Sequence, residues 1–403
     1  MQDVIAAAGP EFATRHHLPW RVREVLRHMT QCGTGERGFN LLACDECGGL
    51  DWVPRGCGDR HCPSCHKRGV EEWVQRRERE LFPVPYFHLV FTLPPQLRGL
   101  CLENRRSLLD LLMRTVRETL QTFAEDPRHL GAVPSLLLVL HTWNQRLDFH
   151  PHVHVVISAG GFRATDDTWV PARHDGYLFP VRALSKVFRG KLLDGLKSLR
   201  HADSLCFDAP QNQSLGTRYT WRKLLDTLYA SPFVVYAKRP FGGPRQVLRY
   251  LARYTHRTAI SNGRLLTVDD QRVTFRYNDR RAMRQRTRTL DVDAFLRLFC
   301  THILPKRFHR IRFAGLLAPN RRVVLARARR AAAQHCQVDL PEPTLAVERP
   351  TSSVCPHCGH PERRVLLTLL QPEPYADQQR ILATLGARPP PSPTLVPQRR
   401  RAA

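Results

Sequence analysis

The strongest constraint on the fold is the segment 136–159, LLLVLHTWNQRLDFHPHVHVVISA, in which two apolar runs flank a polar connection. Each run has the length and composition of a β-strand, so the segment predicts two paired strands. The second run carries His150, His152 and His154 at alternate positions. Successive side chains of a strand point to opposite faces of its sheet. His152 and His154 therefore present two imidazoles side by side on rigid backbone.

Two neighbouring imidazoles form half of a divalent-metal site. His141 and Gln145 lie just upstream and are the candidates for a third ligand, and His150 is a weaker one. In the competing interpretation, one histidine is a hydrogen-bonded core residue and the others are exposed. The additional ligand candidates nearby favour the metal site.

The composition indicates a polyanionic partner. The chain has 403 residues, enough for two or three domains, and a formal net charge of +26. Such a charge attracts phosphates, with anionic lipid as the competing partner. No apolar run approaches the ~20 residues that a membrane-spanning helix needs, and the N-terminal residues do not resemble a signal peptide. We therefore expect a soluble cytoplasmic protein without a membrane partner.

The twelve cysteines indicate metal binding, because disulfides are rare in the cytoplasm. Two Cys-x2-Cys pairs separated by fourteen residues come close to a known zinc pattern. The predicted zinc ligands are Cys44, Cys47, Cys62 and Cys65. Four thiolates close a tetrahedron and leave no open position, so this Zn²⁺ is expected to be structural. Cys57 could replace one ligand or serve a second ion, and the pair Cys355 and Cys358 is only half a site.

The rest of the chain mixes helical and strand patterns, which indicates an α+β or α/β fold with one central sheet. Helices are expected up to residue 30 and over 70–82, 108–123, 181–199, 220–229, 245–256, 292–303 and 321–334. Further strands are expected over 86–93, 233–238, 265–268 and 273–277, with a turn at Gly160–Gly161. The proline-rich, basic segment from residue 389 is expected to be disordered.

Tyr250 and Tyr254 are four residues apart on the expected helix 245–256, so their rings share one face. Val247 and Leu251 lie on the same stripe, and packing is the competing interpretation. The helix region is also basic, with Arg249, Arg253 and Arg257 as candidate DNA contacts. A basic tyrosine helix in a protein with a histidine metal site favours phosphodiester transesterification. A tyrosine oxygen can form a covalent intermediate, and a divalent cation polarises the phosphate.

These blocks resemble the two-tyrosine rolling-circle transposases of the insertion-sequence-91 type, within the HUH single-strand endonucleases. His152-Val153-His154 looks like the histidine–hydrophobic–histidine motif of that family. The segment 249–265, RYLARYTHRTAISNGRL, is similar to its tyrosine block, with Tyr250 and Tyr254 at the two nucleophile positions. The cysteine-rich segment looks like its N-terminal zinc domain, and 302–317, HILPKRFHRIRFAGLL, like its downstream signature.

The resemblance implies an α+β fold, in which helices flank a central antiparallel sheet that carries the histidines, with an N-terminal zinc-binding domain. It also implies Mg²⁺ or Mn²⁺ as the catalytic cation and cleavage of one strand of DNA. The product would be a 5′-phosphotyrosine link with a free 3′-OH, formed at the ends of the element and at its target. If one tyrosine acts alone, Tyr250 is favoured, because Tyr254 lies nearer the centre of the apolar stripe.

The composition and the motifs divide the chain into five expected parts, and three other functions compete with that of a transposase. The expected parts are a helical segment 1–30, a zinc-binding domain 31–70, a catalytic domain 71–318, an accessory region 319–388 and a tail 389–403. The rivals are a relaxase or replication initiator with the same chemistry, a zinc-dependent DNA-binding protein without activity, and a zinc phosphodiesterase.

Interleaved aromatic and basic residues suit single-stranded DNA. Trp143, Phe149 and Trp169 are candidates for base stacking, with buried packing as the competing interpretation.

Overall fold

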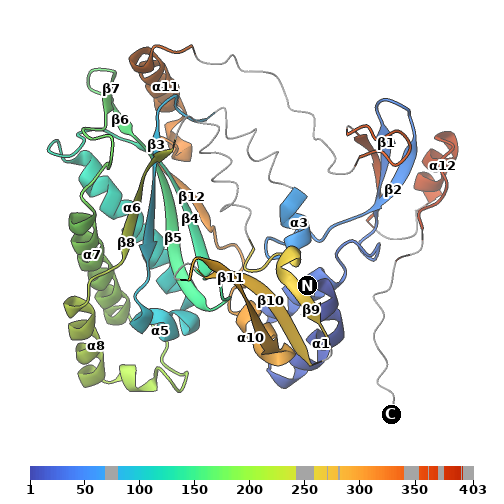
Figure 1. Ribbon diagram of the computed structural model, residues 1–403, viewed down its shortest axis with the longest axis horizontal. Coiled ribbons are helices and arrows are strands. Elements are labelled where there is room, and N and C mark those ends of the chain that lie inside the picture. Colours follow the sequence, from blue (N-terminus) through green and yellow to red (C-terminus); the bar gives the residue numbers. More distant parts are fainter. Residues whose placement is uncertain are drawn as a thin grey trace.

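The fold is built around a five-stranded antiparallel sheet with the strand order β12-β4-β5-β3-β8 (Figure 1). Its strands are β3 (Tyr86–Thr92), β4 (Ser135–Trp143), β5 (Phe149–Ser158), β8 (Val235–Phe241) and β12 (Ile311–Gly315). The computed structural model describes residues 1–68, 80–241, 258–269, 271–279, 282–339, 354–361, 363–370, 376–391 and 393. The expected helix 245–256 lies outside these residues, as does most of the expected helix 70–82. The predicted α+β class with a central antiparallel sheet is confirmed.

Helices cover one face of this sheet (Figure 1). They are α5 (Arg98–Glu103), which follows the short 3-10 helix η1 (Pro95–Leu97), α6 (Arg105–Glu125), α7 (Val181–His201) and α8 (Arg218–Ala230), which follows η2 (Gln213–Gly216). The apolar residues of α6 recur every three or four positions, and Leu112, Val116 and Leu120 are completely buried. They pack against Phe91, Val153 and other residues that point to the same side of β3 and β5. Because successive side chains point to opposite faces of each strand, the apolar residues at alternate positions place the face toward α6 in the main hydrophobic core.

The opposite face of the sheet carries the histidines and is covered by α11 (Arg322–Cys336) near Leu137 and Val156. The hairpin of β6 (Gly160–Arg163) and β7 (Thr168–Pro171) packs beside α11. The predicted turn at Gly160–Gly161 is therefore wrong, because these glycines begin β6. Gly160 has φ +141°, a conformation that favours glycine, and a Cβ there would lie 2.6 Å from the Val170 carbonyl oxygen.

A second sheet, in the order β11-β10-β9, packs against N-terminal helices. It consists of β9 (Leu265–Val268), which follows η3 (Asn262–Arg264), β10 (Arg272–Asp279) and β11 (Arg284–Asp291). Val273 and Phe275 belong to one buried core with residues of α10 (Val292–Cys300), α1 (Gln2–Arg15) and α2 (Trp20–Thr30). The predicted hairpin over 265–277 is confirmed. Strand β11 was missed because its sequence, RQRTRTLD, alternates arginine with polar residues instead of apolar ones.

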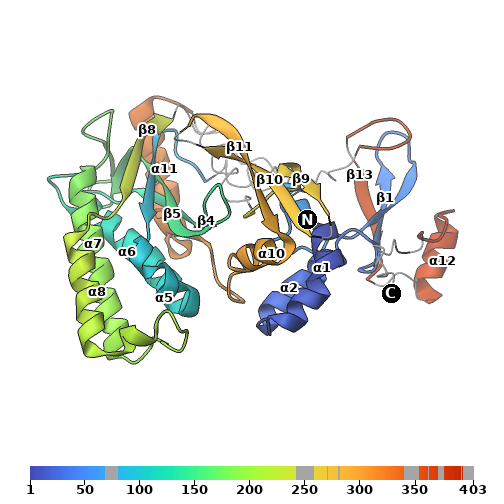
Figure 2. The same ribbon diagram turned by 60° about the horizontal axis from the view of Figure 1, so that its bottom comes forward.

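A third sheet joins residues from opposite ends of the chain, in the order β13-β1-β2 (Figure 2). Its strands are β1 (Phe39–Cys44), β2 (Leu50–Pro54) and β13 (Arg363–Thr368). Among the described residues, the remaining helices are α3 (Pro63–Arg68), η4 (Pro319–Arg321) and α12 (Ala376–Thr384). Nothing in the segment 31–68 predicted strands, because apolar periodicity is weak there. Across the described part of the chain, the structure contains no helix with the length and apolar character required to traverse a bilayer.

Candidate active site and metal centres

Three histidines converge on the face of the central sheet that lies opposite α6. In the register of β4 and β5, His141 is directly opposite His152, and His154 is opposite Val139. One ring nitrogen of each of His141, His152 and His154 lies within 4.8 Å of the others. His141 and His154 are buried, whereas His152 is half-buried. The structure therefore brings the two motif histidines together with the tentative third ligand.

The other two candidates for the third ligand lie elsewhere. Gln145 lies in the connection between β4 and β5, where its backbone carbonyl accepts a hydrogen bond from Arg264. His150 is outside the cluster, and its Nδ1 accepts a hydrogen bond from the Arg98 guanidinium at 2.6 Å. Burial, together with the Arg98 charge, lowers the pKa of His150. An imidazole nitrogen that accepts from arginine has no lone pair left at that position for a metal.

The hydrogen bonds of the motif histidines orient their Nε2 atoms toward each other. Nδ1 of His152 donates to the backbone carbonyl of His150 at 2.7 Å, which fixes the tautomer. Nε2 of His152 lies 3.1 Å from Nε2 of His154. Two nitrogens that share one metal ion through bonds of ~2.1 Å lie about 3.0–3.4 Å apart. The spacing of the two imidazoles therefore fits a shared cation.

His88 on β3 extends this cluster, and sequence reasoning missed it. Its Nε2 lies 2.9 Å from Nδ1 of His154, and the two rings stack with centroids 5.2 Å apart. Burial, followed by the positive charge of Lys238, lowers the pKa of His88 to about 4. The ring is therefore neutral at neutral pH and can accept the Nδ1–H of His154. His88 interrupts the apolar run YFHLVFT, and that polar residue within a predicted strand was the available signal.

His302, from the predicted downstream signature, secures the connection between β4 and β5. Its Nε2–H donates to the carbonyl of Leu147 at 2.9 Å, and its Nδ1 accepts from the Thr142 hydroxyl at 3.2 Å. The ring is buried and stacks on Phe149. Burial lowers the pKa of His302 to about 4. The signature segment thus holds the turn that connects the two histidine strands.

Eight of the twelve cysteines form two clusters, and the predicted ligand set Cys44, Cys47, Cys62 and Cys65 is divided between them. The clusters are Cys32, Cys57, Cys62 and Cys65, and separately Cys44, Cys47, Cys355 and Cys358. In the first, the Sγ of Cys65 lies 3.5 Å from that of Cys32 and 3.6 Å from that of Cys57. The predicted grouping fails because Cys44 ends β1, which pairs with β13 from the other end of the chain. The spacing of two local pairs carries no information about such long-range pairing.

The first cysteine cluster is tied directly to the signature segment. Between Cys57 and Cys62, the Asp59 carboxylate accepts from the His61 ring at 2.7 Å, and His61 Nε2 accepts the amide hydrogen of Leu304 at 3.1 Å. Arg60 donates to the carbonyl of Pro305 at 2.9 Å. The cysteine cluster therefore supports the same segment that positions the turn between the histidine strands.

The edge strand β8 exposes an aromatic residue, Tyr236, on the sheet face that carries the histidines. In the sheet register, Tyr236 is opposite Val90, and Val90 is opposite His154, so all three share one face. Tyr236 is 52% exposed, and Lys238 on the same strand face is also exposed. The predicted stacking candidates Trp143, Phe149 and Trp169 are all buried, which supports the packing interpretation for them.

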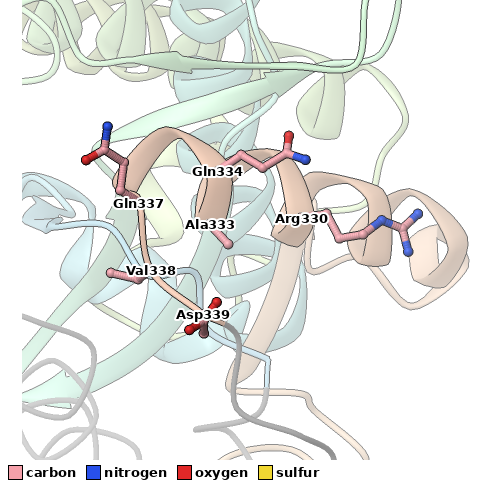
Figure 3. A pocket seen from close by; sticks show the side chains of 6 residues that line it. All are labelled: Arg330, Ala333, Gln334, Gln337, Val338 and Asp339. Carbon is pink, nitrogen blue, oxygen red and sulfur yellow. The ribbon is translucent and has the colours of Figure 1, made fainter.

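The remaining predicted site residues lie outside the described residues. They are Tyr250, Tyr254, Arg249, Arg253 and Arg257. A surface hollow at the C-terminal end of α11 is lined by Arg330, Ala333, Gln334, Gln337, Val338 and Asp339 (Figure 3). None of its lining residues belongs to the histidine or cysteine clusters.

Comparisons with known proteins assign this chain, with its converging histidines and its cysteine-rich N-terminal region, to the class of transposases with a zinc-binding domain. A family model described as "Putative transposase" matches residues 136–323, and one described as "Transposase zinc-binding domain" matches residues 4–93. The chain is 40% identical over 317 residues to "Putative transposase y4qJ" of Sinorhizobium fredii, covering 78% of this chain and 79% of that protein.

The chain is also 29% identical over 298 residues to the transposase for insertion sequence element IS801 of Pseudomonas savastanoi, covering 73% of this chain and 70% of that protein. No solved structure matches this chain. The chain belongs to the insertion-sequence-91 family of transposases.

Proposed function

We propose that this transposase cleaves and rejoins single-stranded DNA by rolling-circle chemistry, through a covalent 5′-phosphotyrosine intermediate. The observation that carries the proposal is the convergence of His141, His152 and His154 on one sheet face within 4.8 Å. Tyr250 and Tyr254 are the proposed nucleophiles. The protein would act in the cytoplasm on nucleoid DNA, at the element ends and at the target.

The donor set fits a catalytic divalent cation. Three imidazole nitrogens suit Mn²⁺ and other borderline ions better than Mg²⁺, which prefers oxygen ligands. When bound, the ion would polarise the scissile phosphate and offset its developing charge. The chain holds its own ligands in position, with the His150 carbonyl orienting His152 and with His88 orienting His154.

In the proposed step, a phenolic oxygen forms a bond to phosphorus and the bond from phosphorus to the 3′ oxygen breaks. The phenolic proton is lost, and the leaving 3′ oxygen takes up a proton to become a free 3′-OH. The phosphotyrosine bond retains the energy of the broken phosphodiester, so rejoining needs no nucleotide cofactor. A second tyrosine permits a second cleavage while the first is occupied.

The surroundings of the histidines suit an unpaired strand. Tyr236 exposes a ring on which a base can stack, and Lys238 lies beside it. Together with the net charge of +26, these residues predict that affinity for DNA falls steeply with salt.

We propose a structural Zn²⁺ at Cys32, Cys57, Cys62 and Cys65, all of which lie within the matched zinc-binding domain.

The test is incubation with labelled single-stranded oligonucleotides of the element ends, with Mn²⁺ or Mg²⁺, followed by a denaturing gel. A DNA-linked protein band that disappears in the Tyr250→Phe/Tyr254→Phe variant is the expected result. Cleavage without an adduct would instead identify a hydrolytic phosphodiesterase. Neither cleavage nor adduct, across metals and sequences, would leave a DNA-binding protein. A relaxase or replication initiator would form the adduct but would not join the element to a target strand.

A further inference from the structure

We infer that the chain holds a second structural zinc ion, bound by Cys44, Cys47, Cys355 and Cys358, which fastens the C-terminal segment to the N-terminal zinc-binding domain. The matched zinc-binding domain ends at residue 93, so half of these ligands lie far outside it. The inference is independent of the proposed strand transfer, because it concerns only the thiolates and the sheet that they join.

The positions of the sulfurs fit a tetrahedral zinc site. The Sγ atoms of Cys44 and Cys358 lie 3.6 Å apart, and those of Cys47 and Cys355 lie 3.7 Å apart. Four sulfurs at ~2.3 Å from one zinc ion lie about 3.8 Å from one another. A disulfide would bring a pair to ~2.05 Å. The spacing is therefore that of thiolates around one ion, and it is close to the 3.5 and 3.6 Å of the first cluster.

The two halves of the site have the same local structure. In both, the sequence is Cys-x2-Cys-Gly, and the glycine after the second cysteine has a positive φ, +67° at Gly48 and +77° at Gly359. Gly48 donates its amide hydrogen to the carbonyl of Cys44 at 3.0 Å, and Gly359 donates to that of Cys355 at 2.9 Å. Each turn thus places two thiols on one side, which is how a zinc knuckle presents its ligands.

Strand β13 follows the second knuckle directly and completes the N-terminal sheet. It pairs with β1 along most of its length, and beyond it Phe39 and Leu369 exchange both backbone hydrogen bonds, at 3.1 and 2.8 Å. The buried guanidinium of Arg363 donates to the Asp51 carboxylate on β2 at 2.8 Å. The C-terminal segment is therefore part of the N-terminal fold.

Zinc at this site would decide whether that fold forms. A two-stranded hairpin such as β1-β2 is marginally stable by itself, and β13 supplies the third strand. Zinc bound by residues so far apart in sequence contributes its binding free energy to folding. Loss of the ion should release β13 from β1 and leave the histidine sheet intact.

The first experiment counts zinc in the purified full-length chain by inductively coupled plasma mass spectrometry. We expect two zinc ions per chain, one in the Cys355→Ser/Cys358→Ser variant, and two in the control Cys336→Ser, which changes a cysteine outside both clusters. Hydrogen exchange should then show faster exchange in β13 and β1 of the double variant and unchanged protection in β4 and β5. Equal zinc contents in the unaltered chain and in the double variant overturn the inference.

A second experiment needs no variant and stays informative if the double variant fails to fold. Cys47, Cys358 and Cys206 are all exposed, and Cys206 belongs to neither cysteine cluster. A metal-bound thiolate resists alkylation, so Cys47 and Cys358 should react with iodoacetamide on the order of tenfold more slowly before treatment with a strong chelator than after it. The rate at Cys206, whose thiol donates to the Asp208 carboxylate, should be the same before and after chelation. Alkylation rates of Cys47 and Cys358 that do not change on chelation overturn the inference.

Discussion

Nε2 of His88 lies 2.9 Å from Nδ1 of His154, so the strand beside the histidine motif supplies a hydrogen-bond acceptor for one of its rings. Partners of this kind fix the tautomer and orientation of metal-ligating histidines. His88→Ala should weaken Mn²⁺ binding by about 10- to 100-fold, as measured by isothermal titration calorimetry. His88→Gln, which keeps an acceptor, should recover part of the loss. Unchanged Mn²⁺ affinity in His88→Ala would remove the orienting role.

The identity of the third ligand can be tested by two single substitutions. His141 is part of the cluster, whereas Gln145 lies in the connection after β4. His141→Ala should abolish measurable Mn²⁺ binding at the histidine site and DNA cleavage, because two imidazoles hold the ion poorly. Gln145→Ala should leave both nearly unchanged. The reverse pattern in calorimetry and in the cleavage assay would assign the third position to Gln145.

The buried ring of His302 predicts an acid-sensitive stability. Its pKa in the folded chain is lowered to about 4, against about 6.5 in an unfolded chain. As the pH falls, the unfolded chain therefore binds the proton before the folded chain does. The contribution of His302 to the free energy of unfolding is fully present above pH ~6.5 and decreases as the pH drops toward ~4. One such group contributes a slope of about 1.4 kcal/mol per pH unit within that window.

Urea unfolding at several pH values between 4 and 7.5 measures this dependence. The groups that act on the pKa of His302 include Arg105 and His61, which oppose its protonation, and the Leu147 carbonyl and Asp148, which favour it. His302→Gln should be less stable at pH 7.5 and should show a shallower loss toward acid. A variant with the same pH slope as the unaltered chain would show that the acid sensitivity arises elsewhere, for instance at His61.

The exposed ring of Tyr236 predicts a contribution to DNA binding. Tyr236→Ala should weaken binding of a single-stranded oligonucleotide by about 1–3 kcal/mol, in fluorescence anisotropy, because one stacking surface is lost. Tyr236→Phe keeps the ring and should bind normally. Tyr219→Ala, at a residue 77% exposed on α8 away from the histidine face, is the matched control. Equal losses at both positions would mean that the effect is unspecific.

The positive charge of Lys238 should affect DNA binding differently from the ring of Tyr236. Lys238→Ala should weaken binding of all sequences similarly and reduce the salt dependence by about one unit of its logarithmic slope. Titrations of the oligonucleotide at several salt concentrations measure that slope. A slope identical to that of the unaltered chain would show that Lys238 makes no phosphate contact.

The sequence by itself determined the parts of this protein that depend on local period. Two apolar runs of strand length in 136–159 predicted both strands of the central hairpin, and the alternation of side chains along a strand placed His152 and His154 on one face. The spacing of apolar residues over 108–123 predicted α6. Side chains repeat every 2.0 residues along a strand and every 3.6 residues along an α-helix, so residues close together in the sequence are enough to define both patterns.

Only the tertiary structure decided which distant residues meet. The register of β3 against β5 brings His88 to His154, and the pairing of β13 with β1 brings Cys355 and Cys358 to Cys44 and Cys47. A Cys-x2-Cys pair has the same local structure whichever partner pair completes its tetrahedron. Its partner is selected by strand pairing and burial across more than three hundred residues, which no local pattern records.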